Sequence, residues 1–258
     1  MRRIPTDEEG TPISPPAVEP MLDSRVSSGR RIPLMTQTRS YELMTPLFGG
    51  GAKPGRADSD LVIRGSGIRG QLRFWWRACR GGQFGGDLWR MREAESRLWG
   101  AASTSDSPRP SQVDVVVNVT HRGEPLYAFR LEQRERGVAV RADNTVAPSY
   151  AAFPLQPKDE DMRRDGMNTT IHPVVGRVMF DLILTFPENE RDEIEAALWA
   201  WETFGGVGGR TRRGFGALRL TAVDGSPVGA PRAQDVASFI ARGLHKHVVD
   251  GEWPNGVP

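Results

Sequence analysis

The sequence of 258 residues is poor in cysteine, lysine and histidine. The single cysteine, Cys79, excludes a disulfide within the chain and a zinc site built from cysteines. No run of 18 apolar residues is present, and the N-terminus lacks the apolar segment of a signal peptide. We therefore expect a soluble, cytoplasmic protein that contacts no membrane.

Lysine supplies only three of the 34 basic residues, and arginine supplies the rest. Against 32 acidic residues this gives a formal net charge of +2, so the chain as a whole is close to neutral. The positive charge is local instead, because arginines gather in two segments while acidic residues gather elsewhere. The preference for arginine over lysine fits a GC-rich genome and selection for RNA contacts equally well.

Histidine is the side chain that most often transfers protons in enzymes, and this chain has four. They are His121, His172, His245 and His247. His245 and His247 are two positions apart and point away from each other on a helix, so we expect no metal pair there. None of the four lies in the two arginine-rich segments, and His172 is the one candidate for a general base. We expect no catalytic residue, no metal site and no cofactor.

The first arginine-rich segment spans residues 61–80 and contains no acidic residue. The turn residues Gly65, Ser66 and Gly67 separate a short apolar run from a stretch with helical periodicity. The apolar face of the predicted helix consists of Ile68, Leu72, Trp75 and Cys79, with Trp76 at its border. The segment therefore predicts a helix that buries one oily face.

A second stripe of this helix is basic. Its members are Arg69, Arg73, Arg77 and Arg80. Because the segment has no carboxylate, these arginines repel one another unless a polyanion lies against them. Arginine makes forked contacts with phosphates and stacks on bases, and a helix N-terminus attracts phosphate. The segment favours nucleic-acid binding, with a solvated surface helix or an acidic protein partner as the alternatives.

The second arginine-rich segment spans residues 205–216 and reads GGVGGRTRRGFG. It is not the phosphate loop of nucleotide hydrolases, because it lacks glycine-lysine followed by serine or threonine. It is not a dinucleotide-binding motif, because it follows a predicted helix and precedes a predicted strand. We interpret it as a flexible basic loop that follows a nucleic-acid backbone, with Phe215 available to stack on a base.

The rest of the chain predicts an α+β protein behind a flexible, proline-rich tail at residues 1–35. Strands are predicted at residues 36–45, 113–119, 128–131, 138–141, 148–153, 174–186 and 217–223, and further helices at 87–99, 190–204 and 233–248. Residues 47–60 and 156–173 are predicted as a glycine-rich loop and a long polar loop. This order fits an antiparallel sheet with helices on one face.

Four stretches resemble a known family. TPLFGGG, IRGSGIRGQLRFWWRA and LWG at Leu98 to Gly100 are similar to the first subunit of the Cmr complex. That complex is the type III-B CRISPR effector of the repeat-associated mysterious protein (RAMP) superfamily. FGGVGGRTRRGFG resembles the C-terminal glycine-rich loop of the superfamily.

The resemblance implies a core at residues 36–223 with a ferredoxin-like fold related to RNA-recognition modules. A second, compressed ferredoxin-like unit is the alternative, with halves at residues 36–155 and 156–223. Residues 224–258 then form a C-terminal helix and tail.

The function implied by the resemblance is a non-catalytic RNA-binding subunit of an RNA-guided antiviral complex. It would hold the 3′ portion of the guide RNA (crRNA) and the adjoining target RNA, beside other RAMP subunits. The implied RNA-binding residues are Arg64, Arg69, Arg73, Trp76, Arg77, Arg210, Arg212 and Arg213. Trp76 is the tryptophan expected to stack on a base.

Three alternatives stay open beside this function. A guide-processing endoribonuclease of the same fold would use His172. The target-cutting subunit of such complexes uses a loop aspartate near the position of Asp58 and Asp60, which implies metal-dependent RNA cleavage as the second alternative. The third is a protein-docking scaffold with a basic helix.

Overall fold

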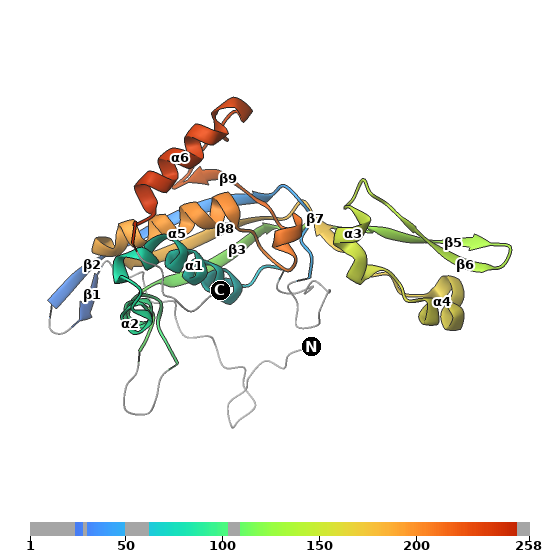
Figure 1. The fold of residues 1–258 in the computed structure, drawn as a ribbon, viewed down its shortest axis with the longest axis horizontal. Coiled ribbons are helices and arrows are strands. Elements are labelled where there is room, and N and C mark those ends of the chain that lie inside the picture. Colours follow the sequence, from blue (N-terminus) through green and yellow to red (C-terminus); the bar gives the residue numbers. More distant parts are fainter. Residues whose placement is uncertain (1–23, 28–29, 50–61, 103–108, 252–258) are drawn as a thin grey trace, which may run out of the picture.

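A six-stranded antiparallel sheet forms the centre of the protein in the computed structural model, which describes residues 24–27, 30–49, 62–102 and 109–251 (Figure 1). Its strands are β1 (Ser24–Ser27), β2 (Arg30–Leu43), β3 (Asp114–His121), β8 (Met179–Pro187), β9 (Leu218–Val223) and β10 (Ser226–Pro227). The strand order is β10-β9-β2-β8-β3, and β1 pairs with the first part of β2. Both β2 and β3 pair with β8, so the halves considered at residues 36–155 and 156–223 share one main sheet.

Helices α1 (Gly65–Arg80) and α5 (Arg191–Phe204) lie side by side on one face of this sheet (Figure 1). Along the chain the elements run β2, α1, β3, β8, α5 and β9, with α2 (Leu88–Trp99) following α1. Alternate residues of β8, from Phe180 to Phe186, point into the core beneath the helices, as period-two patterning predicts. The predicted α+β class with an antiparallel sheet is confirmed.

A buried polar network joins β2 to α5. Arg39 lies beneath the helix and pairs with Glu195 at 2.5 Å and with Glu202 at 2.9 Å. The Tyr41 hydroxyl also donates to Glu202, at 2.6 Å. Burial raises the pKa of Glu202, although the charge of Arg39 acts against that rise. The network fixes α5 on the sheet and so positions the glycine-rich loop that follows the helix.

No described helix covers the opposite face of the sheet, which is polar. Ser40 donates to Asp181 at 2.7 Å, and Thr36 and Thr185 share a hydrogen bond of 2.9 Å. Arg219 pairs with Glu42 at 2.5 Å across the same face. The residues of β2, β3 and β8 whose side chains share this face, as far as the strand register places them, include no Phe, Tyr or Trp, and His121 at the end of β3 is their one aromatic side chain.

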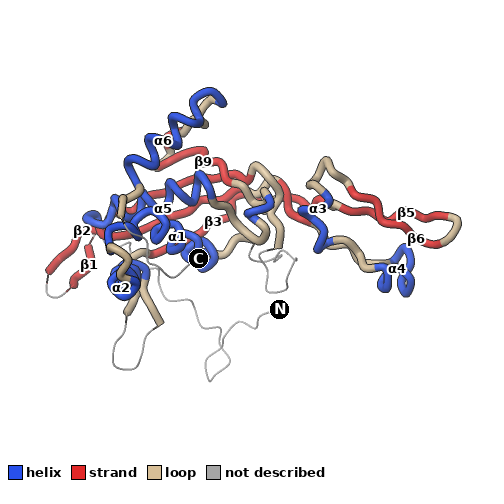
Figure 2. Tube along the Cα trace, in the orientation of Figure 1, coloured by secondary structure: helices blue, strands red, loops and turns tan. Residues whose placement is uncertain are grey.

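The segment between β3 and β8 forms an arm that extends away from the main sheet (Figure 2). Its elements are β4 (Glu124–Leu126), β5 (Phe129–Arg134), β6 (Gly137–Ala142), α3 (Ser149–Ala152), α4 (Asp159–Asp165) and β7 (Val174–Gly176). β5 pairs with β6, and β4 with β7. A second core fills the base of the arm with Phe48, Ala128, Phe129, Ala147, Ala151, Ala152, Leu155, Val174 and Phe215.

Helix α6 (Val236–His247) projects from the main body beyond α5 (Figure 1). It packs Gly243 and His247 against Trp199 of α5. Other apolar residues of α6, among them Val236 and Leu244, are exposed. Short 3-10 turns lie at Gly81–Phe84, Phe153–Leu155, Gly166–Asn168, Glu188–Glu190, Thr211–Arg213 and Ala233–Asp235.

The flexible tail predicted for residues 1–35 is too long. Strand β1 and the start of β2 form a hairpin, in which Pro33 faces Ser24. A proline is tolerated at this position because β2 pairs only with β1 there and begins to pair with β8 at Leu34, but it disguised the strand pattern in the sequence. The strand predicted at residues 36–45 therefore begins earlier, at Arg30.

Three predictions about the arm and β8 are wrong in detail. The strand predicted at residues 148–153 is the short helix α3, which begins where the Asn144 side chain accepts a hydrogen bond from the Ser149 amide at 2.9 Å. The loop predicted at residues 156–173 contains α4, which buries no residue and so leaves no apolar periodicity in the sequence. The strand predicted at residues 174–186 is broken at Arg177, whose φ is 57°.

Within the described part of the chain, no helix is both long enough and apolar enough to cross a bilayer.

Candidate nucleic-acid interface

The glycine-rich loop at residues 205–216 is held in place by the segment that follows β2. The Gly209 amide donates to the Phe48 carbonyl at 2.7 Å, and the Gly216 amide donates to the Pro46 carbonyl at 2.9 Å. Phe215 is buried, with its ring centroid 5.2 Å from that of Phe48. The prediction of a stacking role for Phe215 is therefore wrong, because the ring is buried against Phe48 and anchors the loop.

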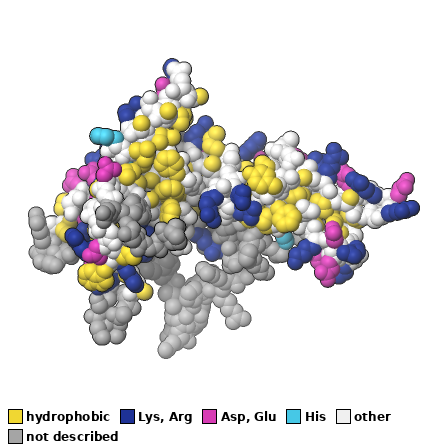
Figure 3. Space-filling view, in the orientation of Figure 1, with side chains coloured by type: hydrophobic (Ala, Val, Ile, Leu, Met, Phe, Trp, Pro, Cys, Tyr) yellow, Lys and Arg dark blue, Asp and Glu magenta, His cyan; other side chains and the backbone are white. Residues whose placement is uncertain are grey.

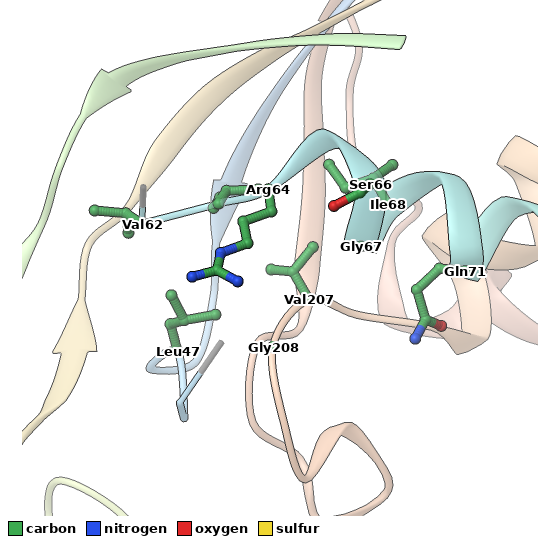
Figure 4. A pocket seen from close by; sticks show the side chains of 10 residues that line it. Leu47, Val62, Arg64, Ser66, Gly67, Ile68, Gln71, Val207 and Gly208 are labelled. Atoms are coloured by element: carbon green, nitrogen blue, oxygen red, sulfur yellow. The ribbon is translucent and has the colours of Figure 1, made fainter. Parts of the chain in front are cut away.

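The two arginine-rich segments meet at one pocket of about 380 Å³. Residues from Arg64 to Gln71 at the start of α1 line it on one side, and Leu47, Val207 and Gly208 line it on the other (Figure 4). The Arg64 guanidinium extends toward Leu47 (Figure 4). The first turn of α1 contains no acidic residue that could neutralise the positive end of the helix dipole. An anion at this pocket would meet Arg64 and the helix N-terminus together.

The loop presents three arginines beside this pocket. Arg212 and Arg213 are exposed, and Arg210 is half-buried with its Cζ atom 5.7 Å from the centroid of the Phe48 ring. Residues 210–213 line a hollow of about 650 Å³. Among the described residues, none of the three arginines forms an ion pair with a carboxylate. Uncompensated positive charge of this kind attracts a polyanion.

The arginines of the α1 stripe are placed differently, because carboxylates from neighbouring helices meet them. Glu95 of α2 accepts from Arg73 Nε at 2.7 Å and also pairs with Arg77. Arg80 lies 3.1 Å from Glu193 of α5. These two carboxylates relieve part of the repulsion among the four arginines of the stripe, which the segment alone does not reveal.

Arg69, the remaining stripe residue, points its Nη2 atom toward the Val113 carbonyl at 3.4 Å. That carbonyl carries no net charge, so Arg69 has only a long contact with a neutral group among its described hydrogen bonds. Arg69 is one turn from Ser66 and Gly67, which line the pocket at the start of α1. Of the stripe, Arg69 is the residue best placed to join the pocket.

Trp76 belongs to the core. Its side chain is 2% exposed, and its Nε1 atom donates to Glu193 at 2.6 Å. The buried face of α1 is Ile68, Leu72, Trp76 and Cys79, so Trp76 takes the place predicted for Trp75. The prediction that Trp76 stacks on a base is wrong, because no face of its ring is accessible.

Glu95 is the site residue that the sequence analysis missed. It is buried on α2 at helical spacing with Met91, Leu98 and Trp99. A glutamate among apolar positions of a helix must find a cationic partner in the core, and this pattern was a signal for an ion pair. The partners are Arg73 and Arg77.

The candidates for catalysis are not brought together. His172 is half-buried between α4 and β7, and Asp58 and Asp60 lie outside the described residues. The described ranges contain no group of three or more His, Cys, Asp or Glu side chains arranged to hold a metal ion. Burial raises the pKa of the Cys79 thiol to about 11, which leaves it protonated and unreactive at neutral pH.

An antiparallel sheet with helices on one face, and a basic glycine-rich loop after α5, defines an α+β protein with a basic edge. Residues 40–219 match the family model of the RAMP superfamily, and the chain belongs to this superfamily. The resemblance noted in the sequence is thereby confirmed.

Two curated relatives come from Pyrococcus furiosus. CRISPR system Cmr subunit Cmr1-1 is 27% identical over 159 residues, which cover 61% of this chain and 40% of the relative. CRISPR system Cmr subunit Cmr1-2 is 27% identical over 186 residues, which cover 69% of this chain and 91% of the relative. The chain thus spans less than half of the first relative and most of the second.

Two solved structures share the fold. The crystal structure of apo Cmr1 from Pyrococcus furiosus has a TM-score of 0.53 and 20% identity, covering 81% of this chain and 58% of that chain. A chain of the type III-B Cmr-beta complex bound to cognate target RNA has a TM-score of 0.51 and 14% identity, covering 83% of this chain and 63% of that chain.

Proposed function

We propose that this chain is a non-catalytic RNA-binding subunit of a type III-B CRISPR effector complex. It would act in the cytoplasm beside other RAMP subunits and hold the 3′ portion of the guide RNA and the adjoining target RNA. Its relatives carry the names of Cmr subunits, and a structural neighbour belongs to a complex with target RNA. Membership of the RAMP superfamily supports the same class of function.

The observation that carries the proposal is the set of loop arginines at positions 210, 212 and 213. Backbone hydrogen bonds hold the loop that carries them, and no described carboxylate pairs with them. They lie beside the pocket that Arg64 lines, so a phosphate backbone passing along this edge would meet both groups. Arginines on an anchored loop, without a described carboxylate partner, favour RNA because their charge is not offset by an ion pair that binding must first break.

A ferredoxin-like assignment of the main sheet is part of this proposal. The order of elements is β-α-β-β-α-β when α1 and α2 count as one layer helix, and the strand order β9-β2-β8-β3 supports the assignment. RNA-recognition modules of this topology stack bases on aromatics of the open sheet face. In this chain the described strands place no Phe, Tyr or Trp on that face, and its one aromatic side chain, His121, contacts the Arg177 carbonyl through Nδ1 at 2.7 Å. We therefore assign the RNA to the edge formed by the loop and the start of α1.

The test replaces two loop arginines. We expect Arg212→Ala with Arg213→Ala to weaken binding of the full chain to a single-stranded RNA oligomer about tenfold or more, because two charged hydrogen-bonding groups are lost. The slope of log affinity against log salt should become shallower by about 0.7 for each phosphate contact removed. Fluorescence anisotropy at several salt concentrations measures both quantities.

Arg73→Ala is the matched control, because it removes an arginine that Glu95 already neutralises. We expect it to leave the salt slope unchanged. An unchanged affinity in the loop variant would overturn the assignment of the interface. Running the same oligomer on a denaturing gel checks catalysis: discrete products that disappear in His172→Ala would contradict a non-catalytic function.

A further inference from the structure

Helix α3 and the turn after it bury their small residues and expose their large ones. Ala151 and Ala152 are fully buried in the second core, whereas Tyr150 is 66% exposed and Phe153 is 65% exposed. Folding normally places aromatics inside, because they bury more apolar area than alanine. The two rings are separated by three positions, which puts them on the same side of a helical turn. An exposed aromatic pair on a firmly packed support is typical of a binding surface.

The pair lies next to the glycine-rich loop. The Arg213 Cζ atom stands over the Tyr150 ring, 5.9 Å from its centroid. The loop and α3 share the second core, in which Phe48 and Phe215 pack with Ala151 and Ala152. Figure 3 shows dark blue basic side chains beside yellow hydrophobic groups where the main body meets the arm. The rings and the loop arginines therefore belong to one rigid surface.

We propose that Tyr150 and Phe153 form a stacking site for unpaired bases of the RNA whose phosphates the loop arginines hold. The proposal rests on the function proposed above and adds residues that contact bases. Arg213 covers one face of Tyr150, and a base on the exposed face would complete a stack of guanidinium, phenol and base. Such stacking depends little on sequence, because every base has a π face.

The charge around the pair favours a nucleic acid over a protein. A single-stranded RNA offers flat rings and phosphates in regular alternation, and this surface offers aromatic rings beside arginines that no described carboxylate pairs with. An apolar protein surface would leave Arg212 and Arg213 beside it without counter-charge. A protein partner is the competing outcome of the test.

The experiment compares a double variant, which carries both Tyr150→Ala and Phe153→Ala, with the wild-type protein. We expect affinity for a single-stranded RNA oligomer to fall at least about fivefold, since a stacked base contributes substantially to binding. The salt slope should stay unchanged, because neither side chain neutralises a phosphate. Both residues are exposed, so the thermal midpoint should not move, and a circular-dichroism melt checks this. Trp89→Ala is the matched control: Trp89 is 72% exposed but lies on α2, away from the loop.

A second readout reports stacking directly. An oligomer with 2-aminopurine at successive positions should lose fluorescence on binding wild type at one or more positions and not on binding the Tyr150→Ala, Phe153→Ala variant. An oligomer with abasic sites at those positions should bind both proteins equally well. These results together support a stacking site.

The outcomes separate this inference from the proposed function. Wild-type affinity and quenching in the aromatic variant, with weakened binding in the Arg212→Ala, Arg213→Ala variant, would overturn the stacking site and leave the RNA-binding function intact. Full affinity in both variants would remove the proposed function as well. Unchanged RNA affinity, with lost assembly of the aromatic variant with other RAMP subunits, would identify the pair as a protein contact and overturn the stacking site.

Discussion

The two arginine-rich segments have similar composition but differ in what neutralises their charge. On α1, Arg73 and Arg77 meet Glu95 from α2, and Arg80 meets Glu193 from α5. In the loop at residues 205–216, no described carboxylate meets the arginines. The density of arginine in a segment therefore does not locate an anion site, because carboxylates distant in sequence decide which arginines keep their charge available.

The difference follows from packing. Helix α1 has neighbours on two sides, α2 and α5, and each contributes a glutamate where an arginine of the stripe emerges. The loop is packed through its backbone, Val207 and Phe215, and Arg210 lies over the Phe48 ring, whereas Arg212 and Arg213 are exposed. The arginines of α1 thus pair within the helical layer, whereas the described residues offer the loop arginines no carboxylate.

A substitution at Gly216 should have the largest effect on stability, and it tests how rigidly the loop is held. Its φ is +63°, and a Cβ atom there would overlap the carbonyl oxygen of Val207. We expect Gly216→Ala to lower the free energy of unfolding by about 3–4 kcal/mol, from backbone strain and steric overlap together. Urea-induced unfolding of the full chain measures it.

Gly214 is the control within the same loop. Its φ is +86°, but a Cβ atom there would meet nothing within 4 Å. Gly214→Ala should cost only the strain of a left-handed residue, about 1–2 kcal/mol. Equal effects at both positions would contradict a loop anchored at Gly216, since the steric overlap would then contribute nothing.

A substitution at Glu95 tests what its ion pairs with Arg73 and Arg77 contribute to the stability of the helical layer. We expect Glu95→Ala to lower the free energy of unfolding by about 2 kcal/mol, because it leaves Arg73 and Arg77 next to each other without a counter-charge. The value lies below that of a fully buried pair, because a third of each arginine side chain is exposed to solvent. The same urea titration measures this effect.

Glu93 is the matched control on the same helix, since it pairs with Arg109 at an exposed position. Glu93→Ala should change stability by less than about 0.5 kcal/mol. If Glu95→Ala were as mild as this control, the ion pairs of α1 would not hold the helical layer together, and the contrast with the loop would weaken.

Most of the fold could be predicted from hydrophobic periodicity. The helices α1, α2, α5 and α6 and the strands β3, β8 and β9 follow apolar patterns of the expected period. Helix α4 was not predicted because it buries no residue, and β2 was predicted too short because Pro33 lies within it. Periodicity reports burial, so it fails where an element forms without burying a face.

The candidate site was predictable only in part. Glycine and arginine content located both segments, because these residues act through backbone conformation and charge. The pairing of Arg73 with Glu95 spans 22 positions, and nothing in the local sequence specifies it. Trp76 and Phe215 were assigned to stacking although both are buried, since an aromatic next to arginines has the same local pattern in a core and at an interface.

The smallest expected effect is on the pH dependence of stability, and it arises at the C-terminal end of α1. There Arg80 donates to the His247 carbonyl at 3.4 Å. The His247 ring stacks on Trp199, 5.2 Å between centroids. Burial, followed by the charges of Lys246 and Arg80, lowers the pKa of His247, with Glu195 and Asp192 acting weakly against them. The folded state thus binds a proton at this site less readily than the unfolded state does.

The stability that His247 contributes should therefore be complete above the unfolded histidine pKa of about 6.5 and decline as the pH falls through the lower folded pKa. His247→Gln should remove that part of the decline, whereas His245→Gln, at an exposed position of the same helix, should retain it. Urea titrations of the three proteins between pH 7 and pH 5 measure the difference. A small decline specific to His247 would show that even one added positive charge disfavours the already paired end of α1. Equal pH profiles for all three proteins would show that protonated His247 is solvated as in the unfolded chain. The C-terminal end of α1 would then tell nothing about how paired and unpaired arginines differ.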